Sequence, residues 1–164
     1  MKKVYKALID FIEVHLSVIF FLLLFLSMIG QVFMRYVLNN PSPALYEISS
    51  YSFVWVTLLS AAYAKKLNKH IRFNIVIEKF SRKVQIIIEM IFDFIIIFTF
   101  VISLYPVISQ AFWYKIIKSQ VLQIPWTYLI ICLPLFMILI IIHNIEGIVK
   151  NINELKKLKN LEEK

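Results

Sequence analysis

Four long apolar runs dominate the pattern of hydrophobic and polar positions along the chain. No Asp, Glu, Lys or Arg interrupts residues 16–34, 48–64, 94–114 and 119–142. Because a helix of about 20 residues crosses the hydrocarbon core of a bilayer, each run is a candidate span. The pattern predicts an all-α membrane protein, with residues 1–164 in a single membrane domain. Its four transmembrane helices are expected at approximately 15–38, 44–66, 84–114 and 124–149.

The segment between the second and third predicted spans, residues 70–83, has a different pattern. It mixes isoleucine, valine and phenylalanine with lysine, arginine and glutamate, and it is too short and too charged to cross a membrane. Apolar residues beside basic ones are typical of a short amphipathic helix that lies in the headgroup layer. We therefore predict an interfacial helix in this segment.

Composition and charge agree with a membrane protein and set its orientation. The chain is 60% hydrophobic with a mean hydropathy of +0.78, which is too apolar for a soluble domain of 164 residues. Fifteen of the 18 Lys and Arg residues lie before the first span, between Lys65 at the end of the second span and Lys83 before the third, or after the fourth; the others are Arg35, Lys115 and Lys118. This asymmetry predicts that both termini are cytoplasmic. The net charge of +8 then reflects topology and attraction to membrane lipids, not nucleic acid.

The second predicted span is rich in small residues. Because lipid provides no hydrophobic force between helices, small side chains are typical of close helix packing. We predict a helix-packing or partner face made of Ser49, Ser52, Trp55, Ser60 and Ala64. This face packs either within the chain or against a second protein.

Arg35 and Glu47 lie at the predicted outer ends of the first two spans, on either side of a short hairpin. We predict an ion pair between them or, alternatively, contact of these residues with a partner protein. A charged pair costs less at the edge of the bilayer than at its centre.

Lys65, Lys66, His70 and Arg72 are predicted to form a cytoplasmic loop that anchors the topology. The three histidines, His15, His70 and His143, have no metal-ligand partner at a typical spacing. We therefore predict no metal site.

Glu89 and Asp93 are four residues apart, which places both on one face of the third span. Intramembrane acids are candidates for function. Ion pairing with the nearby lysines Lys65, Lys66 or Lys69 is the expectation, and a site for a coupling ion is the alternative.

No arrangement of residues in the sequence indicates catalysis. The chain has only two glycines, so it lacks a phosphate-binding loop, and no nucleophile is accompanied by a base. We expect no catalytic residues, no cofactor and no enzymatic activity.

The order of motifs resembles a known family. An Arg-Tyr ends the first span in "QVFMRYVLNN", and a Glu opens the second in "YEISSYSFVWVTLLSAAYAKK". A His-Ile follows the basic turn in "KHIRFNIVIEKF", and "QIPWTYLIICLPL" opens the fourth span. Over nearly the whole chain these features resemble the small integral membrane subunit, the Q component, of tripartite ATP-independent periplasmic (TRAP) transporters.

The resemblance implies a non-catalytic scaffold subunit in the bacterial inner membrane. The implied partners are a large multi-span TRAP subunit that moves as an elevator and binds sodium, and a periplasmic protein that binds transiently and delivers an organic acid. That acid would be of the C4-dicarboxylate or sialic acid class. The alternative is an autonomous four-helix exporter acting as a homodimer, which would need a membrane-embedded glutamate in the first span, where Glu13 is the candidate.

Overall fold

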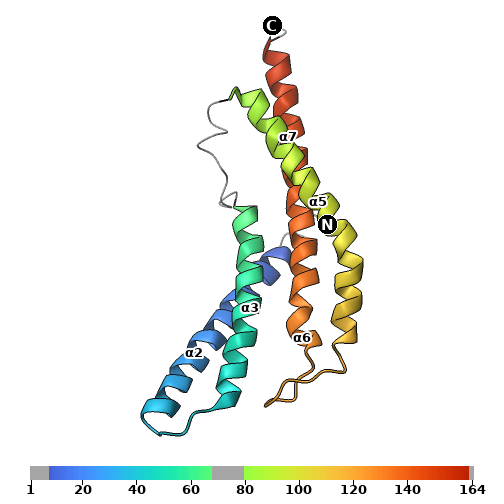
Figure 1. Ribbon diagram of the computed structural model, residues 1–164. Helices are drawn as coiled ribbons and strands as arrows, with labels where there is room; N and C mark the ends of the chain where they lie inside the picture. The colour runs from blue at the N-terminus through green and yellow to red at the C-terminus, as the bar shows by residue number, and fades with distance from the viewer. Residues whose placement is uncertain (1–7, 68–79, 163–164) are drawn as a thin grey trace.

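The computed structural model describes residues 8–67 and 80–162 (Figure 1). Over these residues the chain forms helices and no strand, which confirms the all-α fold. The elements are η1 (Phe11–His15), α2 (Leu16–Tyr36), α3 (Pro43–Lys66), α5 (Arg82–Trp113), α6 (Thr127–Ile130) and α7 (Cys132–Glu162).

The helices form two antiparallel hairpins that meet through α3 and α7. In one hairpin α3 packs against α2, and in the other α7 packs against α5. Figure 1 shows the connections 37–42 and 114–126 at the same end of the molecule, which we name the loop end. At the opposite end, α5 and α7 continue together past the last turn of α3.

The first hairpin agrees with its predicted boundaries at the loop and in α3, whereas its first helix begins earlier than predicted. The helix of the first span runs from Leu8 to Tyr36 through η1 and α2, so it begins before residue 15 and ends near residue 38. Asn39 then adopts a positive φ of 50°, which asparagine tolerates better than most residues. Pro43 opens α3, where its missing N–H has no cost.

Among the described residues, three helical segments are long and apolar enough to cross a membrane: Leu8–Tyr36, Arg82–Trp113 and Thr127–Leu158. The second predicted span, α3, is not among them. Its 24 residues would reach about 36 Å, which is sufficient in length. Its composition differs because serine, alanine and threonine replace much of the leucine and isoleucine found in the other helices.

The segment predicted as an interfacial helix is covered only in part. Residues 70–79 lie outside the described residues, so that part stays a prediction. Its last two residues, Arg82 and Lys83, do not belong to an interfacial helix, because α5 begins at Arg82 and carries them in its first turn.

The fourth predicted span, 124–149, differs most from the structure. It is divided at Ile131 into the short α6 and the long α7, and α7 continues to Glu162. The extension is held against α5, because the Arg82 Nη2 lies 2.8 Å from Glu154 Oε1 and Asn151 Nδ2 donates to Glu89 Oε2 at 3.3 Å. The polar tail therefore forms one side of a helical pair.

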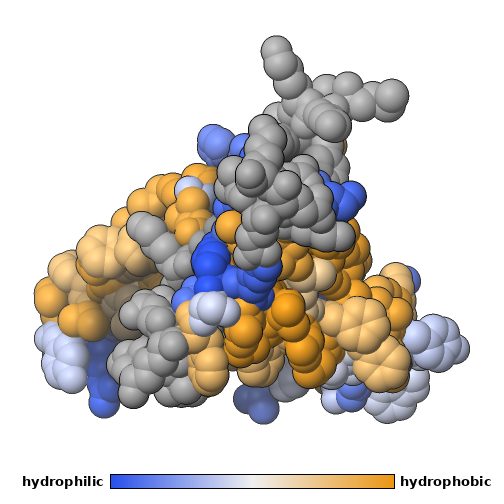
Figure 2. Space-filling model, turned by 90° about the horizontal axis from the view of Figure 1, so that it is seen from above, coloured by the Kyte–Doolittle hydropathy of each residue, from blue (hydrophilic) through white to orange (hydrophobic). Residues whose placement is uncertain are grey.

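The apolar core lies where the N-terminal helix, α3 and α7 meet. Its buried members are Ile9, Leu59, Ala62, Leu139 and Ile140. Most of the large apolar side chains of α2 and α5 are instead exposed on the flanks of the molecule. Figure 2, seen from above, shows hydrophobic residues over both flanks and hydrophilic residues gathered between them. Such flanks suit contact with lipid or with another membrane protein.

Candidate functional site: a buried polar layer and a structured loop

A π-helical turn places Glu13 inside the bundle. In η1 the Leu16 N–H donates to the Phe11 carbonyl, which is an i→i+5 bond. The wider turn carries Glu13, which is only 1% exposed although it bears a carboxylate. Single π-turns within α-helices are rare and occur frequently at functional sites.

The Glu13 carboxylate is contacted from two other helices. Lys66 Nζ, at the end of α3, lies 3.2 Å from Glu13 Oε2 and also pairs with Asp10. His143 Nε2, from the middle of α7, contacts Glu13 Oε1. A buried charge requires such partners, because an unpaired carboxylate in an apolar interior is very costly.

A second ion pair extends this arrangement to α5. Lys65 Nζ, next to Lys66 in sequence, donates to Asp93 Oδ1 at 2.8 Å. Opposite Asp93, α7 carries Gly147, where an added Cβ would lie 3.0 Å from Asp93 Oδ2. The glycine thus leaves room for the aspartate between α5 and α7.

These contacts form one layer across the bundle, and we name it the polar layer. We name the end of the molecule that contains it the layer end. Its members are Asp10, Glu13, Lys65, Lys66, Asp93 and His143. Two adjacent lysines on α3, Lys65 and Lys66, bind acids on two different helices. His143 on α7 contacts one of these acids, Glu13. Four helical segments are therefore cross-linked at one level.

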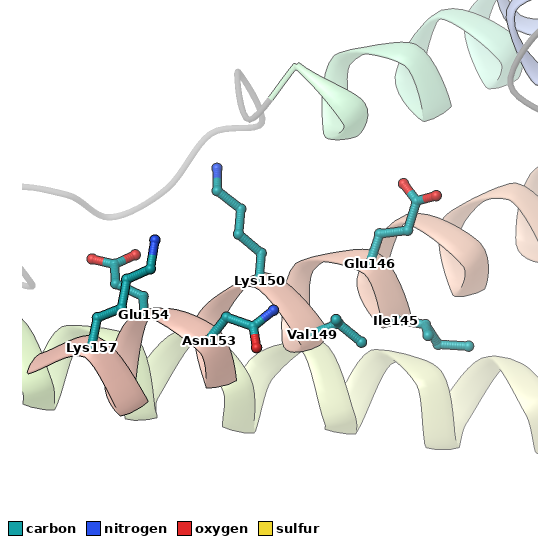
Figure 3. A pocket seen from close by; sticks show the side chains of 7 residues that line it. All are labelled: Ile145, Glu146, Val149, Lys150, Asn153, Glu154 and Lys157. Atoms are coloured by element: carbon teal, nitrogen blue, oxygen red, sulfur yellow. The ribbon is translucent and has the colours of Figure 1, made fainter. Parts of the chain in front are cut away.

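A polar cavity of about 340 Å³ opens beside the polar layer. It is lined by Lys65, Lys66, Arg82, Glu89, Asp93, His143, Glu146, Gly147, Lys150, Asn151 and Glu154. A second, more open groove follows α7, and Figure 3 shows Glu146 and Lys150 extending from α7 on the opposite side from Ile145 and Val149. Acidic and basic groups are mixed along both surfaces, so neither has the single-sign lining of a metal or phosphate site.

Within the part of the chain that the structure describes, no group of three His, Cys, Asp or Glu residues is placed to hold a metal ion. What the polar layer offers chemically is paired charge, with Glu13 and His143 buried inside the bundle. Such an arrangement fixes helix positions as long as the pairs stay intact.

The loop end is organised by Glu47, but not through Arg35. The two carboxylate oxygens of Glu47 accept the backbone N–H groups of Val121 and Leu122 at 2.9 and 3.0 Å. The Arg35 guanidinium instead lies over the ring of Tyr36, 5.6 Å from its centroid. The geometry thus differs from the predicted ion pair, because backbone donors of the 114–126 loop are better placed for Glu47.

Internal hydrogen bonds structure the 114–126 loop. The Ser119 N–H donates to the Ile124 carbonyl at 2.9 Å, and the Trp126 N–H donates to the Ile117 carbonyl at 2.9 Å. The buried Ser119 hydroxyl accepts the Ile124 N–H at 3.2 Å. Together with Glu47, these bonds hold the loop in a defined shape.

The predicted packing face of α3 is divided by the structure. Ser49 and Ser52 are buried within the chain, and Trp55 stacks on Phe20 with ring centroids 4.9 Å apart. Ala64 is half-buried, whereas Ser60 is exposed. The inner part of this face therefore packs within the chain, and a partner contact at Ser60 stays a prediction.

The residues predicted for the cytoplasmic loop are also divided. His70 and Arg72 lie outside the described residues. Lys65 and Lys66 are the last residues of α3, and both point into the polar layer. Asp93 has a lysine partner, and the described partner of Glu89 is Asn151.

Sequence reasoning missed the central pair of the polar layer, Glu13 and His143. These residues are 130 positions apart, and no local pattern relates them. One signal was available: Asp10 and Glu13 are three residues apart, and so lie on one helix face just before an apolar run. Acids at the start of the first helix need basic partners. Lys66 ends α3, and the antiparallel hairpin brings that end next to the start of the first helix.

The long apolar helices, the exposed apolar flanks and the internally paired charges together define a multi-pass helical membrane protein. The family model for tripartite ATP-independent periplasmic transporters, DctQ component, matches residues 11–154. The chain belongs to this family, as its motifs indicated, and is a small membrane component of a TRAP transporter. Comparison with curated proteins gives no match.

Family membership has direct consequences for location and partners. TRAP systems place the DctQ component in the inner membrane, where it works with a large membrane subunit and a periplasmic binding protein. A component of this kind belongs to a transporter and is generally not a catalyst.

Proposed function

We propose that the chain is a non-catalytic scaffold for the large elevator-type subunit of a sodium-coupled, binding-protein-dependent importer. The family match over residues 11–154 is the observation that carries this proposal. Sodium and substrate then bind the large subunit, and this chain holds the fixed part of the assembly in place. The transported molecule is an organic acid of the C4-dicarboxylate or sialic acid class.

The polar layer supports a scaffold in preference to an ion path. Glu13 and Asp93 are already bound by Lys66, His143 and Lys65 within the chain. A carboxylate that coordinates a transported cation would have to release such partners, at a high cost in a buried site. Cross-linking four helical segments suits a rigid support.

The proposed topology has four spans, with α3 as the second, and both termini in the cytoplasm. The distribution of Lys and Arg along the sequence supports it. The layer end then faces the cytoplasm, and the loop end faces the periplasm. Arg35 and the structured 114–126 loop lie on the side from which the binding protein approaches.

Co-purification with the large subunit tests the scaffold role. We expect the tagged chain to retain its cognate large subunit in detergent. Ser60→Phe should lower the yield if the exposed face of α3 meets the partner, whereas Ser109→Phe, at an exposed serine of α5, serves as the matched control. A chain that purifies alone under all conditions would contradict the proposal.

An autonomous exporter is a second candidate because Glu13 is buried in the first helix. Transport by this chain alone in liposomes, abolished by Glu13→Gln, would support the exporter. Uptake that requires the large subunit and the binding protein would support the scaffold.

A further inference from the structure

The open groove and the polar cavity meet on α7. Three residues line both of them: Glu146, Lys150 and Glu154. Because these residues are four apart in a helix, they form one ridge along it, which we name the shared ridge. Ile145 and Val149 line only the groove (Figure 3), whereas Gly147 and Asn151 line only the cavity. A molecule lying across the shared ridge would therefore contact apolar side chains on one side and a polar cavity on the other.

The shared ridge begins at the depth of the lipid headgroups. Glu146 is the first charged residue of α7, and no Asp, Glu, Lys or Arg occurs in residues 119–145. At about 1.5 Å per residue, the stretch from Tyr128 to Glu146 is about 27 Å long, close to the thickness of a hydrocarbon core. In the groove, the two exposed apolar residues are followed by Asn153 and Lys157. The groove therefore passes from the acyl-chain region into the headgroup region.

The basic groups at the groove differ in whether the chain already pairs them. Arg82 of α5 binds Glu154, with its Nη2 2.8 Å from Oε1. Lys150 and Lys157 form no such ion pair within the described residues. Both lysines are exposed, and they lie seven residues apart, so they extend from the same side of α7. They are available to a negatively charged group at the level of the headgroups.

Glu146, the acid that begins the shared ridge, makes no hydrogen bond within the part of the chain that the structure describes. Its Oε2 lies 3.9 Å from His143 Nδ1, which is beyond hydrogen-bond distance. His143 Nδ1 is buried and also has no hydrogen-bond partner among those residues. The edge of the cavity thus presents an exposed carboxylate next to a buried polar atom that the described chain leaves unpaired.

We propose that the groove and the cavity together bind one phospholipid with a zwitterionic ethanolamine headgroup. Its acyl chain lies against Ile145 and Val149. Lys150 and Lys157 bind its phosphate, and Glu146 binds its primary ammonium at the edge of the cavity. The inference rests on the membrane location of the chain and not on its role in transport.

The mixture of charges selects this headgroup among the common phospholipids. The two lysines attract a phosphate, and the carboxylate of Glu146 accepts from a charged donor. An ethanolamine headgroup carries a phosphate and an N–H donor together. A choline headgroup has no N–H to donate, and a glycerol headgroup brings no positive charge to the carboxylate. Ethanolamine is therefore the headgroup of these three that matches both signs of charge.

Native mass spectrometry of the full-length chain in detergent tests the proposal. The chain is equilibrated with phosphatidylethanolamine, phosphatidylcholine and phosphatidylglycerol that carry the same acyl chains. We expect one ethanolamine lipid per chain to be retained, about fivefold more tightly than either of the others, because only this lipid makes the charge-assisted bond to Glu146. Equal retention of the three lipids would overturn the proposal. A chain that retains none, the result expected if a helix of another protein occupies the groove, would also overturn it.

Exposed-residue variants separate this site from a general attraction of lipid to basic residues. Lys150→Gln and Lys157→Gln should each lower the affinity for all three lipids by about two- to fivefold. Glu146→Gln should remove the preference for ethanolamine over choline, and a preference that survives would contradict the assigned ammonium site. Lys156→Gln, at an exposed lysine of α7 outside the groove, is the matched control and should change nothing. A loss in Lys156→Gln equal to that in Lys150→Gln would overturn the proposal.

Discussion

The two ends of the bundle are held by different means. At the layer end, charged side chains from four helical segments meet, and partners such as Glu13 and His143 are far apart in sequence. At the loop end, Glu47 binds backbone N–H groups of the 114–126 loop, and further backbone bonds lie within that loop. The layer end fixes four helical segments relative to each other, and the loop end fixes the shape of one connection and ties it to α3.

The difference shows where a membrane helix bundle obtains its specificity. In lipid, apolar side chains gain little by leaving the solvent, so packing and polar contacts determine which helices associate. The apolar flanks of α2 and α5 would tolerate many arrangements. The polar layer permits few, because each buried charge must keep its partner.

Glu13→Ala should have the largest effect, because it leaves Lys66 and His143 without their buried acid. We expect a loss of about 3–5 kcal/mol in the free energy of unfolding, measured by reversible denaturation in mixed micelles. Asp10→Ala is the matched control: its side chain is 52% exposed, so the loss should stay below about 1 kcal/mol. Equal losses would contradict the claim that the buried Glu13 contributes more to stability than the exposed Asp10.

Gly147→Ala should also weaken the layer end. The new Cβ would stand 3.0 Å from Asp93 Oδ2, while Lys65 holds the other oxygen of that carboxylate. We expect about 1–3 kcal/mol from overpacking, by the same denaturation measurement. At Gly30, near the loop end of α2, the added Cβ meets only a Leu45 methyl at 3.2 Å, which can rotate away. Gly30→Ala should therefore cost less, and the reverse order would contradict this account.

Trp55→Phe tests a link between the two hairpins. The Trp55 Nε1–H donates to the Tyr128 carbonyl at 3.0 Å and so links α3 to α6. Phenylalanine keeps the stack on Phe20 but loses this bond, with an expected cost of about 0.5–1.5 kcal/mol. Trp55→Leu loses the stack as well and should unfold more easily than Trp55→Phe. If the two variants are equal, the stack contributes nothing measurable.

Glu47→Ala should have the smallest effect on global stability and the most local one. Without the carboxylate, the amides of Val121 and Leu122 lose their acceptors and should exchange hydrogen faster. Hydrogen exchange followed by mass spectrometry would detect this change in the 114–126 loop, with no change around His143. Glu47→Gln keeps one acceptor and should show an intermediate rate. Faster exchange at the layer end would show that the two ends are coupled.

Much of the fold could be predicted from the sequence, because long charge-free runs have few alternatives to spanning helices. The boundary near residue 38 and the start of α3 followed from Pro41, Pro43 and the polar turn. The pairing of Asp93 with a lysine was also accessible, since both lie near the same predicted membrane face. The extension of α7 to Glu162 was not, because it depends on contacts with α5.

The polar layer could not be derived in the same way. It requires a π-turn that aims Glu13 inward, and no residue pattern specifies such a turn. It also requires the register of α7 against the first helix, which brings His143 to Glu13. The ion pair expected between Arg35 and Glu47 was plausible from sequence, but the donors that bind Glu47 come from a loop over 70 residues away.

The central claim is that this chain supports transport without carrying the substrate or the coupling ion. Uptake per assembled complex tests it most directly, in proteoliposomes that contain the large subunit, the binding protein and either the wild-type chain or Glu13→Gln. With labelled C4-dicarboxylate and labelled sialic acid as probes, we predict a lower yield of complex and an unchanged rate per complex that forms. A complex that assembles at the wild-type yield but does not transport would contradict the claim.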